Sequence, residues 1–123
     1  MRRVAGVILL LILSSCGGGS SPSSPSAGSA TVTITSAGVN PTQLNIAQGT
    51  RVLFVNNDTR SHSMTSDPHP EHTDCPEINF VNLLQPGQSR ETGNLNTIRT
   101  CGFHDHDDPP PGGAKWAGKI TIR

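Results

Sequence analysis

Short apolar segments separated by glycine and proline are the feature that most constrains how this chain can fold. The 123 residues include 13 glycines and 10 prolines, which interrupt every window long enough for an α-helix. Alternating or continuous apolar patterns predict strands at 31–35, 43–47, 50–56, 96–104 and 118–123, and a short strand around 78–81. Short strands with turn residues between them predict an all-β sandwich.

The residues before this domain form a different kind of segment. Arg2 and Arg3 precede an apolar run that is too short to span a bilayer, and LSSC follows at 13–16. LSSC resembles the lipobox of bacterial lipoproteins, in which the signal is removed before a cysteine that is then lipidated. We therefore predict a signal peptide at 1–15 and a lipidated Cys16. An ordinary signal peptide with a chance cysteine is the alternative.

Residues 16–30 are rich in Gly, Ser and Pro and are predicted to form a flexible tether to a domain at 31–123. This organisation predicts a protein of the bacterial cell envelope, anchored to the membrane by lipid and facing the periplasm or the cell surface. Removal of the signal removes two arginines, so the mature domain is slightly acidic. It lacks the clustered Lys and Arg of a nucleic-acid surface, and no nucleic-acid partner is predicted.

The 5 histidines all lie between residues 62 and 106, and the densest group is CGFHDHDD at 101–108. Residues two apart in a strand point to the same side, so His104 and His106 can share one metal ion. If the strand before His62 neighbours the strand that ends at His104, His62 joins them. Three imidazoles suit copper or zinc. Two solvated histidines in a polar loop are the alternative for His104 and His106.

These segments resemble the cupredoxins, the plastocyanin-like copper proteins. RVLFVNNDTRSHSM, at 51–64, is similar to the family's first ligand segment, in which a histidine follows F-x-N-N by five residues. AGKITIR, at 117–123, is similar to its closing strand. The resemblance covers 31–123 and implies a Greek-key β-sandwich that binds copper.

Two registers of the ligand strand are open within this resemblance. In the first, Cys101 and His104 match the family's Cys-x-x-His and form a blue-copper set with His62. That set lacks its methionine, because none follows and Met64 lies on another segment. In the second, FHDH at 103–106 and SDPHPEH at 66–72 resemble a histidine-only variant found in bacterial cupredoxin-like proteins, and His104 takes the place of the cysteine.

The second register is the favoured one, and it separates the roles of the cysteines. Strand parity turns Cys101 away from His104 and leaves it free to reach Cys75. Lipidation of Cys16 leaves an even number of cysteines, which favours a Cys75–Cys101 disulfide in an oxidising compartment. The predicted copper ligands are His62, His104 and His106, with Cys101, His72, Met64 and His69 as secondary candidates.

Together these patterns predict a lipid-anchored, extracytoplasmic copper protein that acts in electron transfer or copper handling, as a carrier more than as an enzyme. Its partners are the membrane, through the anchor, and a redox or copper-transfer protein. A small copper redox enzyme of the dismutase type is one alternative, which an open coordination position would permit. A metal-free sandwich that serves as a binding module is the other, and metal analysis of the purified protein separates it from the first two.

Overall fold

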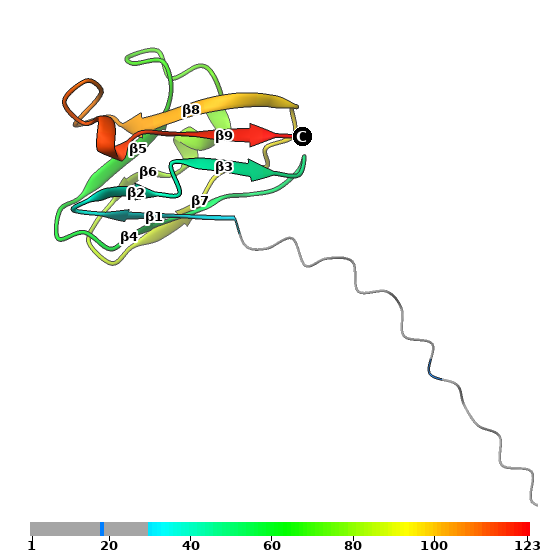
Figure 1. The fold of residues 1–123 in the computed structure, drawn as a ribbon, viewed down its shortest axis with the longest axis horizontal. Helices are drawn as coiled ribbons and strands as arrows, with labels where there is room; N and C mark the ends of the chain where they lie inside the picture. The colour runs from blue at the N-terminus through cyan, green and yellow to red at the C-terminus, as the bar shows by residue number, and fades with distance from the viewer. Residues whose placement is uncertain (1–17, 19–29) are drawn as a thin grey trace, which may run out of the picture.

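Two packed sheets form the domain (Figure 1). The computed structural model describes residue 18 and residues 30–123, and the architecture below is that of those residues. One sheet has the strand order β2-β1-β4-β7 and the other β3-β9-β8-β5-β6. The strands are β1 (Thr31–Thr35), β2 (Gly38–Asn40), β3 (Gln43–Ile46), β4 (Leu53–Asn56), β5 (His62–Ser66), β6 (Asn82–Leu84), β7 (Ser89–Glu91), β8 (Arg99–Asp105) and β9 (Gly118–Ile122).

The sheets combine parallel and antiparallel pairs. The β1–β4 and β3–β9 pairs are parallel, and each brings together strands from distant parts of the sequence. The helices of the described residues are two short 3-10 turns, η1 (Pro76–Phe80) and η2 (Ala114–Trp116). Within the same residues, no helix has the length and apolar character needed to cross a membrane.

The inward-facing residues of the two sheets make a small apolar core. Val32 and Ile34 alternate with half-buried threonines on β1 and are fully buried. Phe54 of one sheet meets Phe103 of the other edge to face, with ring centroids 5.2 Å apart. This edge-to-face geometry is the favourable one for an aromatic pair, and it joins the two sheets at the centre of the sandwich.

The predicted all-β sandwich without α-helices is confirmed, and most of its predicted strands are present with small shifts of their ends. The strand predicted around 78–81 is wrong. Pro76 begins a 3-10 turn there, and strand β6 follows only at Asn82. Three short strands were not predicted: β2, β5 and β7. Strand β5 has the sequence HSMTS, so its buried positions include polar residues and no apolar alternation marks it.

The neighbour of β8 also differs from the sequence prediction. The strand before His62 is β4, which lies in the other sheet. The strands that pair with β8 are β9 and β5, and His62 is the first residue of β5. In the antiparallel β5–β8 pair Met64 lies opposite Asp105 and Thr65 lies opposite His104. His62 therefore belongs to the sheet itself and does not come from a loop above it.

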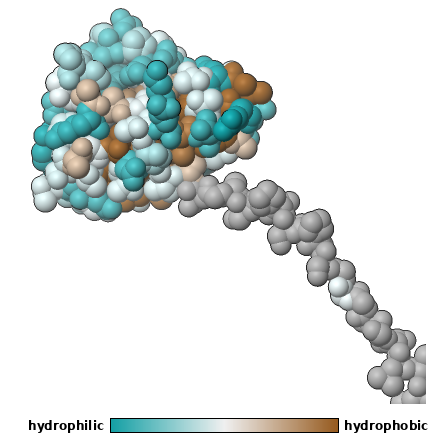
Figure 2. All heavy atoms as spheres, viewed as in Figure 1, coloured by the Kyte–Doolittle hydropathy of each residue, from teal (hydrophilic) through white to brown (hydrophobic). Residues whose placement is uncertain are grey.

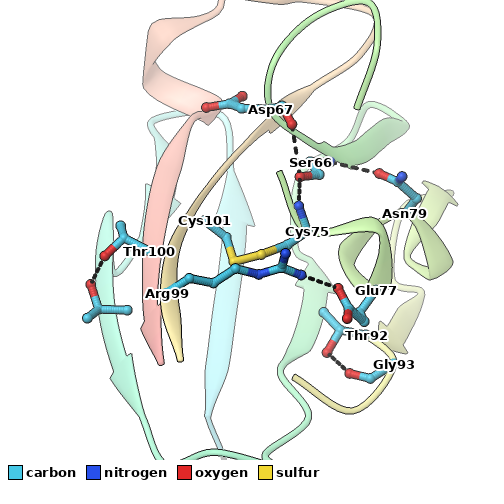
Figure 3. The surroundings of a disulfide bond; sticks show 11 residues. Ser66, Asp67, Cys75, Glu77, Asn79, Thr92, Gly93, Arg99, Thr100 and Cys101 are labelled. Atoms are coloured by element: carbon cyan, nitrogen blue, oxygen red, sulfur yellow. Dashed lines mark hydrogen bonds and ion pairs between the residues drawn. A yellow bond between two sulfur atoms is a disulfide. The ribbon is translucent and has the colours of Figure 1, made fainter. Parts of the chain in front are cut away.

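A disulfide joins Cys75 to Cys101, as the sequence predicts, and ties the start of η1 to β8 (Figure 3). Both cysteines are fully buried. The Cys75 backbone N–H donates a hydrogen bond to Ser66 Oγ at 2.8 Å, at the end of β5. The segment 67–75, which we call the β5–η1 loop, is thus held at both ends. It leaves β5 after Ser66 and returns to the disulfide.

We expect the double substitution Cys75→Ala and Cys101→Ala to lower the free energy of unfolding by about 3 kcal/mol, because the disulfide closes a loop with a sequence separation of 26. Alanine avoids placing a polar hydroxyl in the buried site. Urea unfolding of the purified wild-type and variant proteins measures the difference. Equal unfolding midpoints and slopes would show that the disulfide contributes nothing to stability.

Candidate metal site

The β5–η1 loop lies against the outer face of β8, the face that carries Gly102 and His104. The Asp67 backbone N–H donates a hydrogen bond to the Gly102 carbonyl at 3.0 Å, so the loop begins by pairing with the strand. A Cβ atom at position 102 would overlap Asp67 Oδ2. Only glycine allows this approach, and the close contact brings the Asp67 carboxylate to His104.

Hydrogen bonds fix the second half of the loop around His72. Its φ is +55°, in the left-handed region that costs a non-glycine residue roughly 1–2 kcal/mol. The His72 backbone N–H donates to the Pro68 carbonyl at 2.7 Å, and its carbonyl accepts a hydrogen bond from Asn79 Nδ2 at 2.9 Å. The ring Nδ1 lies 2.7 Å from the Ser66 carbonyl oxygen. The position of the imidazole is therefore set by its backbone and by its ring.

Four imidazoles meet where the loop crosses β8, and we call His69, His72, His104 and His106 the histidine cluster. Ring nitrogens of His69, His72 and His104 all lie within 4.8 Å of one another. His106 Nδ1 lies 2.9 Å from His72 Nε2, and its ring centroid is 5.0 Å from that of His69. His104 is buried, His72 is half-buried, and His69 and His106 are exposed. The cluster is thus anchored in the sheet and open to solvent on one side.

Hydrogen-bond partners assign the ligand atoms of two rings. Carboxylate and carbonyl oxygens accept hydrogen bonds, so the nitrogen beside them carries the proton in a neutral imidazole. His104 Nδ1 lies 2.5 Å from Asp67 Oδ1, and His72 Nδ1 faces the Ser66 carbonyl. The lone pair of each ring is therefore on Nε2. His104 Nε2 is buried and has no hydrogen-bond partner, which is unfavourable unless a cation occupies the space beside it.

The cluster also keeps His69 neutral. Removal of the ring from water lowers the pKa of His69 below its ordinary value, and the neighbouring His106, His104 and His72 lower it further because imidazolium charges repel. Glu71 acts in the opposite direction. A lowered pKa leaves the His69 ring unprotonated at neutral pH, and an unprotonated imidazole is the form that binds metals.

His62 lies on the opposite face of the five-stranded sheet from His104, because it shares the side of Met64 and Asp105. It is fully buried, with Nδ1 2.7 Å from Asp105 Oδ2 and Nε2 2.9 Å from Asp58 Oδ2. Each ring nitrogen of His62 is thus within hydrogen-bond distance of a carboxylate oxygen. The carboxylates sit at opposite ends of the ring and cannot share one ion with it.

The structure therefore brings together two of the three predicted ligands, His104 and His106, and adds the secondary candidates His69 and His72. It does not bring His62 to them. The other secondary candidates also lie elsewhere: Met64 is fully buried in the core and Cys101 is in the disulfide.

Asp67 is the residue of the site that sequence reasoning missed. It lies within the SDPHPEH segment, which the resemblance had singled out for its histidines. Its partner, Gly102, lies in the CGFHDHDD segment. Nothing in either segment indicates that the two are in contact, because the contact depends on how the loop folds back over β8.

The two sheets and their strand order define the cupredoxin-like fold, and this chain has it. Solved structures of cupredoxins match it over most of its length, among them a purple cupredoxin from Nitrosopumilus maritimus, at 18% identity over 76% of this chain and 99% of that chain with a TM-score of 0.58. Plastocyanin from Dryopteris crassirhizoma matches at 19% identity over 76% and 100% of the two chains, with a TM-score of 0.56. An amicyanin variant in its reduced state matches at 13% identity over 78% and 83%, with a TM-score of 0.57.

By sequence, the chain matches no family model and no curated protein. At the identities of the structural matches, the likeness establishes the fold. The chemistry of the site depends on the residues of this chain.

The buried hydrogen bond between His62 and Asp58 predicts how the stability of the domain depends on pH. The hydrogen bond from His62 lowers the pKa of Asp58 below its ordinary value. A carboxyl group with a lowered pKa in the folded state stabilises the protein above its unfolded pKa, near 4, and loses that contribution as pH falls through the folded value. We expect Asp58→Asn to be less stable than wild type at pH 7, with a smaller difference at pH 3. Urea unfolding at both pH values measures this, and a difference independent of pH would contradict it.

Proposed function

We propose that this protein binds one copper ion through the histidine cluster and acts in copper handling outside the cytoplasm. The observation that carries the proposal is the unpaired, buried Nε2 of His104, in a ring that has a nitrogen within 4.8 Å of ring nitrogens of His69 and His72. His72 and His104 would supply Nε2, and His106 and His69 would complete the set from the solvent side. Copper bound there supplies a redox-active cation, while the protein supplies the neutral donors and their orientation.

The donor set favours Cu(II). Imidazole nitrogens suit copper and zinc, whereas Cu(I) prefers the softer sulfur ligands of cysteine and methionine. In the described part of the chain the sulfur atoms are not available to the cluster, because Met64 is in the core and Cys75 and Cys101 are joined. A site that favours one oxidation state is better suited to receiving and releasing the ion than to cycling it.

The charges beside the cluster favour a cation as the arriving species. Asp67 contacts His104, and Glu71 acts on His69. Carboxylates attract copper ions and repel anions, so they oppose an anionic substrate of the kind that a dismutase-like enzyme would use.

Electron transfer is the second candidate, and the specific observation in its favour is the fold shared with plastocyanin and amicyanin.

The proposed setting is the cell envelope, with the domain anchored by a lipid on Cys16. Cys16 lies outside the described residues, and the support comes from its position after the apolar run. The described domain is compatible with this setting. Strand β1 begins at one end of the sandwich, and β8, which carries His104, ends at the other (Figure 1). An anchor before β1 would therefore join the domain at the end opposite to the end of β8.

We expect His72→Ala and His104→Ala each to weaken Cu(II) binding by more than about tenfold, as expected for loss of a ligand. Competition titration against a chelator of known affinity measures this.

His62 as a copper ligand remains a prediction from the sequence, and His62→Asn tests it in the same titration. Because its ring nitrogens face carboxylates, we expect this variant to lose stability while its Cu(II) affinity changes by less than about threefold. Equal losses at all histidines would contradict a formed site.

The anchor has its own test. Cys16→Ala should leave the protein without lipid and release it from the membrane fraction of the cells that express it, because a single short apolar run does not hold a protein in a bilayer. Fractionation followed by intact-mass measurement checks both effects. A variant that stays with the membranes would show that the lipoprotein interpretation is wrong.

A further inference from the structure

We infer that Asp67 is a positioning residue that selects the ligand atom of His104 and raises the preference of the site for Cu(II); this rests on the proposed copper function. Asp67 Oδ1 lies 2.5 Å from His104 Nδ1, while the other ring nitrogen, Nε2, is buried and has no hydrogen-bond partner. The His104 side chain is 1% exposed and that of Asp67 is 40% exposed. The pair connects a buried ligand to a carboxylate at the surface.

The first part of the inference concerns the tautomer. A neutral imidazole carries its proton on either nitrogen, and only the other nitrogen can bind a metal. A carboxylate accepts a hydrogen bond from Nδ1–H and so keeps the His104 lone pair on Nε2. Without it, a fraction of His104 rings would carry the proton on Nε2 and present no lone pair to the cluster. Asp67 removes that competing form before the metal arrives.

The backbone explains why the carboxylate stays in place. Asp67 N–H donates to Gly102 O at 3.0 Å, and Asp67 O accepts a hydrogen bond from the Asp74 N–H at 2.8 Å. The missing side chain at Gly102 provides the space that Asp67 Oδ2 occupies. Residue 67 is therefore fixed between β8 and the returning end of the β5–η1 loop, and its side chain faces His104.

The second part concerns charge, and His72 provides the comparison inside the same site. The Nδ1–H of His72 donates to the neutral carbonyl of Ser66, which orients the ring. The Nδ1–H of His104 donates to a carboxylate, which also makes the ring a stronger electron donor. A stronger nitrogen donor stabilises Cu(II) more than Cu(I), because the attraction grows with the charge on the ion. His104 is therefore the ligand that the charge of Asp67 tunes.

Asp67→Asn in the mature, full-length protein tests the inference, with Asp74→Asn as the matched control. Both variants remove one carboxylate charge from the same loop, but Asp74 has no side-chain contact with the cluster among the interactions of the described residues. We expect Asp67→Asn to lower Cu(II) affinity by about 10- to 100-fold. We expect the loss of Cu(I) affinity to be smaller than the loss of Cu(II) affinity by a factor of about ten. Such a tenfold differential raises the Cu(II)/Cu(I) potential by about 59 mV. Asp74→Asn should leave both affinities within about twofold.

A measurement on the metal-free wild-type protein keeps the test independent of variant folding. The ¹⁵N shifts of the His104 ring should show a proton on Nδ1 and none on Nε2. A proton on Nε2, or an Asp67→Asn variant with unchanged Cu(II) affinity, would overturn the inference. So would equal losses of Cu(II) and Cu(I) affinity, because they indicate a structural role. A wild-type protein with the expected ¹⁵N shifts but no copper binding would instead overturn the proposed function and, with it, the copper preference.

Discussion

The close contact between Asp67 and Gly102 is the interaction on which the rest of the site depends. It places the first residue of the β5–η1 loop against the outer face of β8, and no side chain larger than hydrogen at position 102 is compatible with it. The Cys75–Cys101 disulfide fixes the other end of the loop to the same strand. A small domain with few aromatic residues has little core to stabilise a long loop, so a covalent bond and a backbone contact hold it in place.

Side chains of β8 alternate between its two faces, so the residues that stabilise the core lie on one face and the residues under the β5–η1 loop lie on the other. Cys101, Phe103 and Asp105 face inward, where they form the disulfide, the aromatic core pair and a hydrogen bond with His62. Gly102 and His104 face outward, under the loop. Because the period of a strand is two residues, a shift of register by one position would turn His104 toward the core and Cys101 toward the outer face. The paired carboxylates around His62 oppose such a shift.

The sequence was sufficient for the class of fold and for the proximity of His104 and His106. The strands with apolar alternation, the Cys75–Cys101 pairing and the shared side of His104 and His106 all follow from strand parity and from the spacing of a few residues. Strand β5 did not follow, because polar HSMTS gives no apolar period, and the expected partner of β8 was therefore the wrong strand. The contact of His62 with Asp105 and the contact of Asp67 with His104 depend on the tertiary structure. Local sequence patterns do not indicate which surfaces meet.

The face shown in Figure 2 is mostly hydrophilic, with a hydrophobic area at the right-hand end of the domain. The large hydrophobic side chains exposed in the described residues include Leu83 on β6, which lies opposite Ser63 of β5. Ser63 also accepts the backbone hydrogen bond of His106 at 2.7 Å, so an exposed apolar side chain lies one strand away from the solvent side of the histidine cluster. Exposed imidazoles, nearby carboxylates and a small apolar contact leave this side of the histidine cluster open to solvent, which the proposed uptake and release of copper would require.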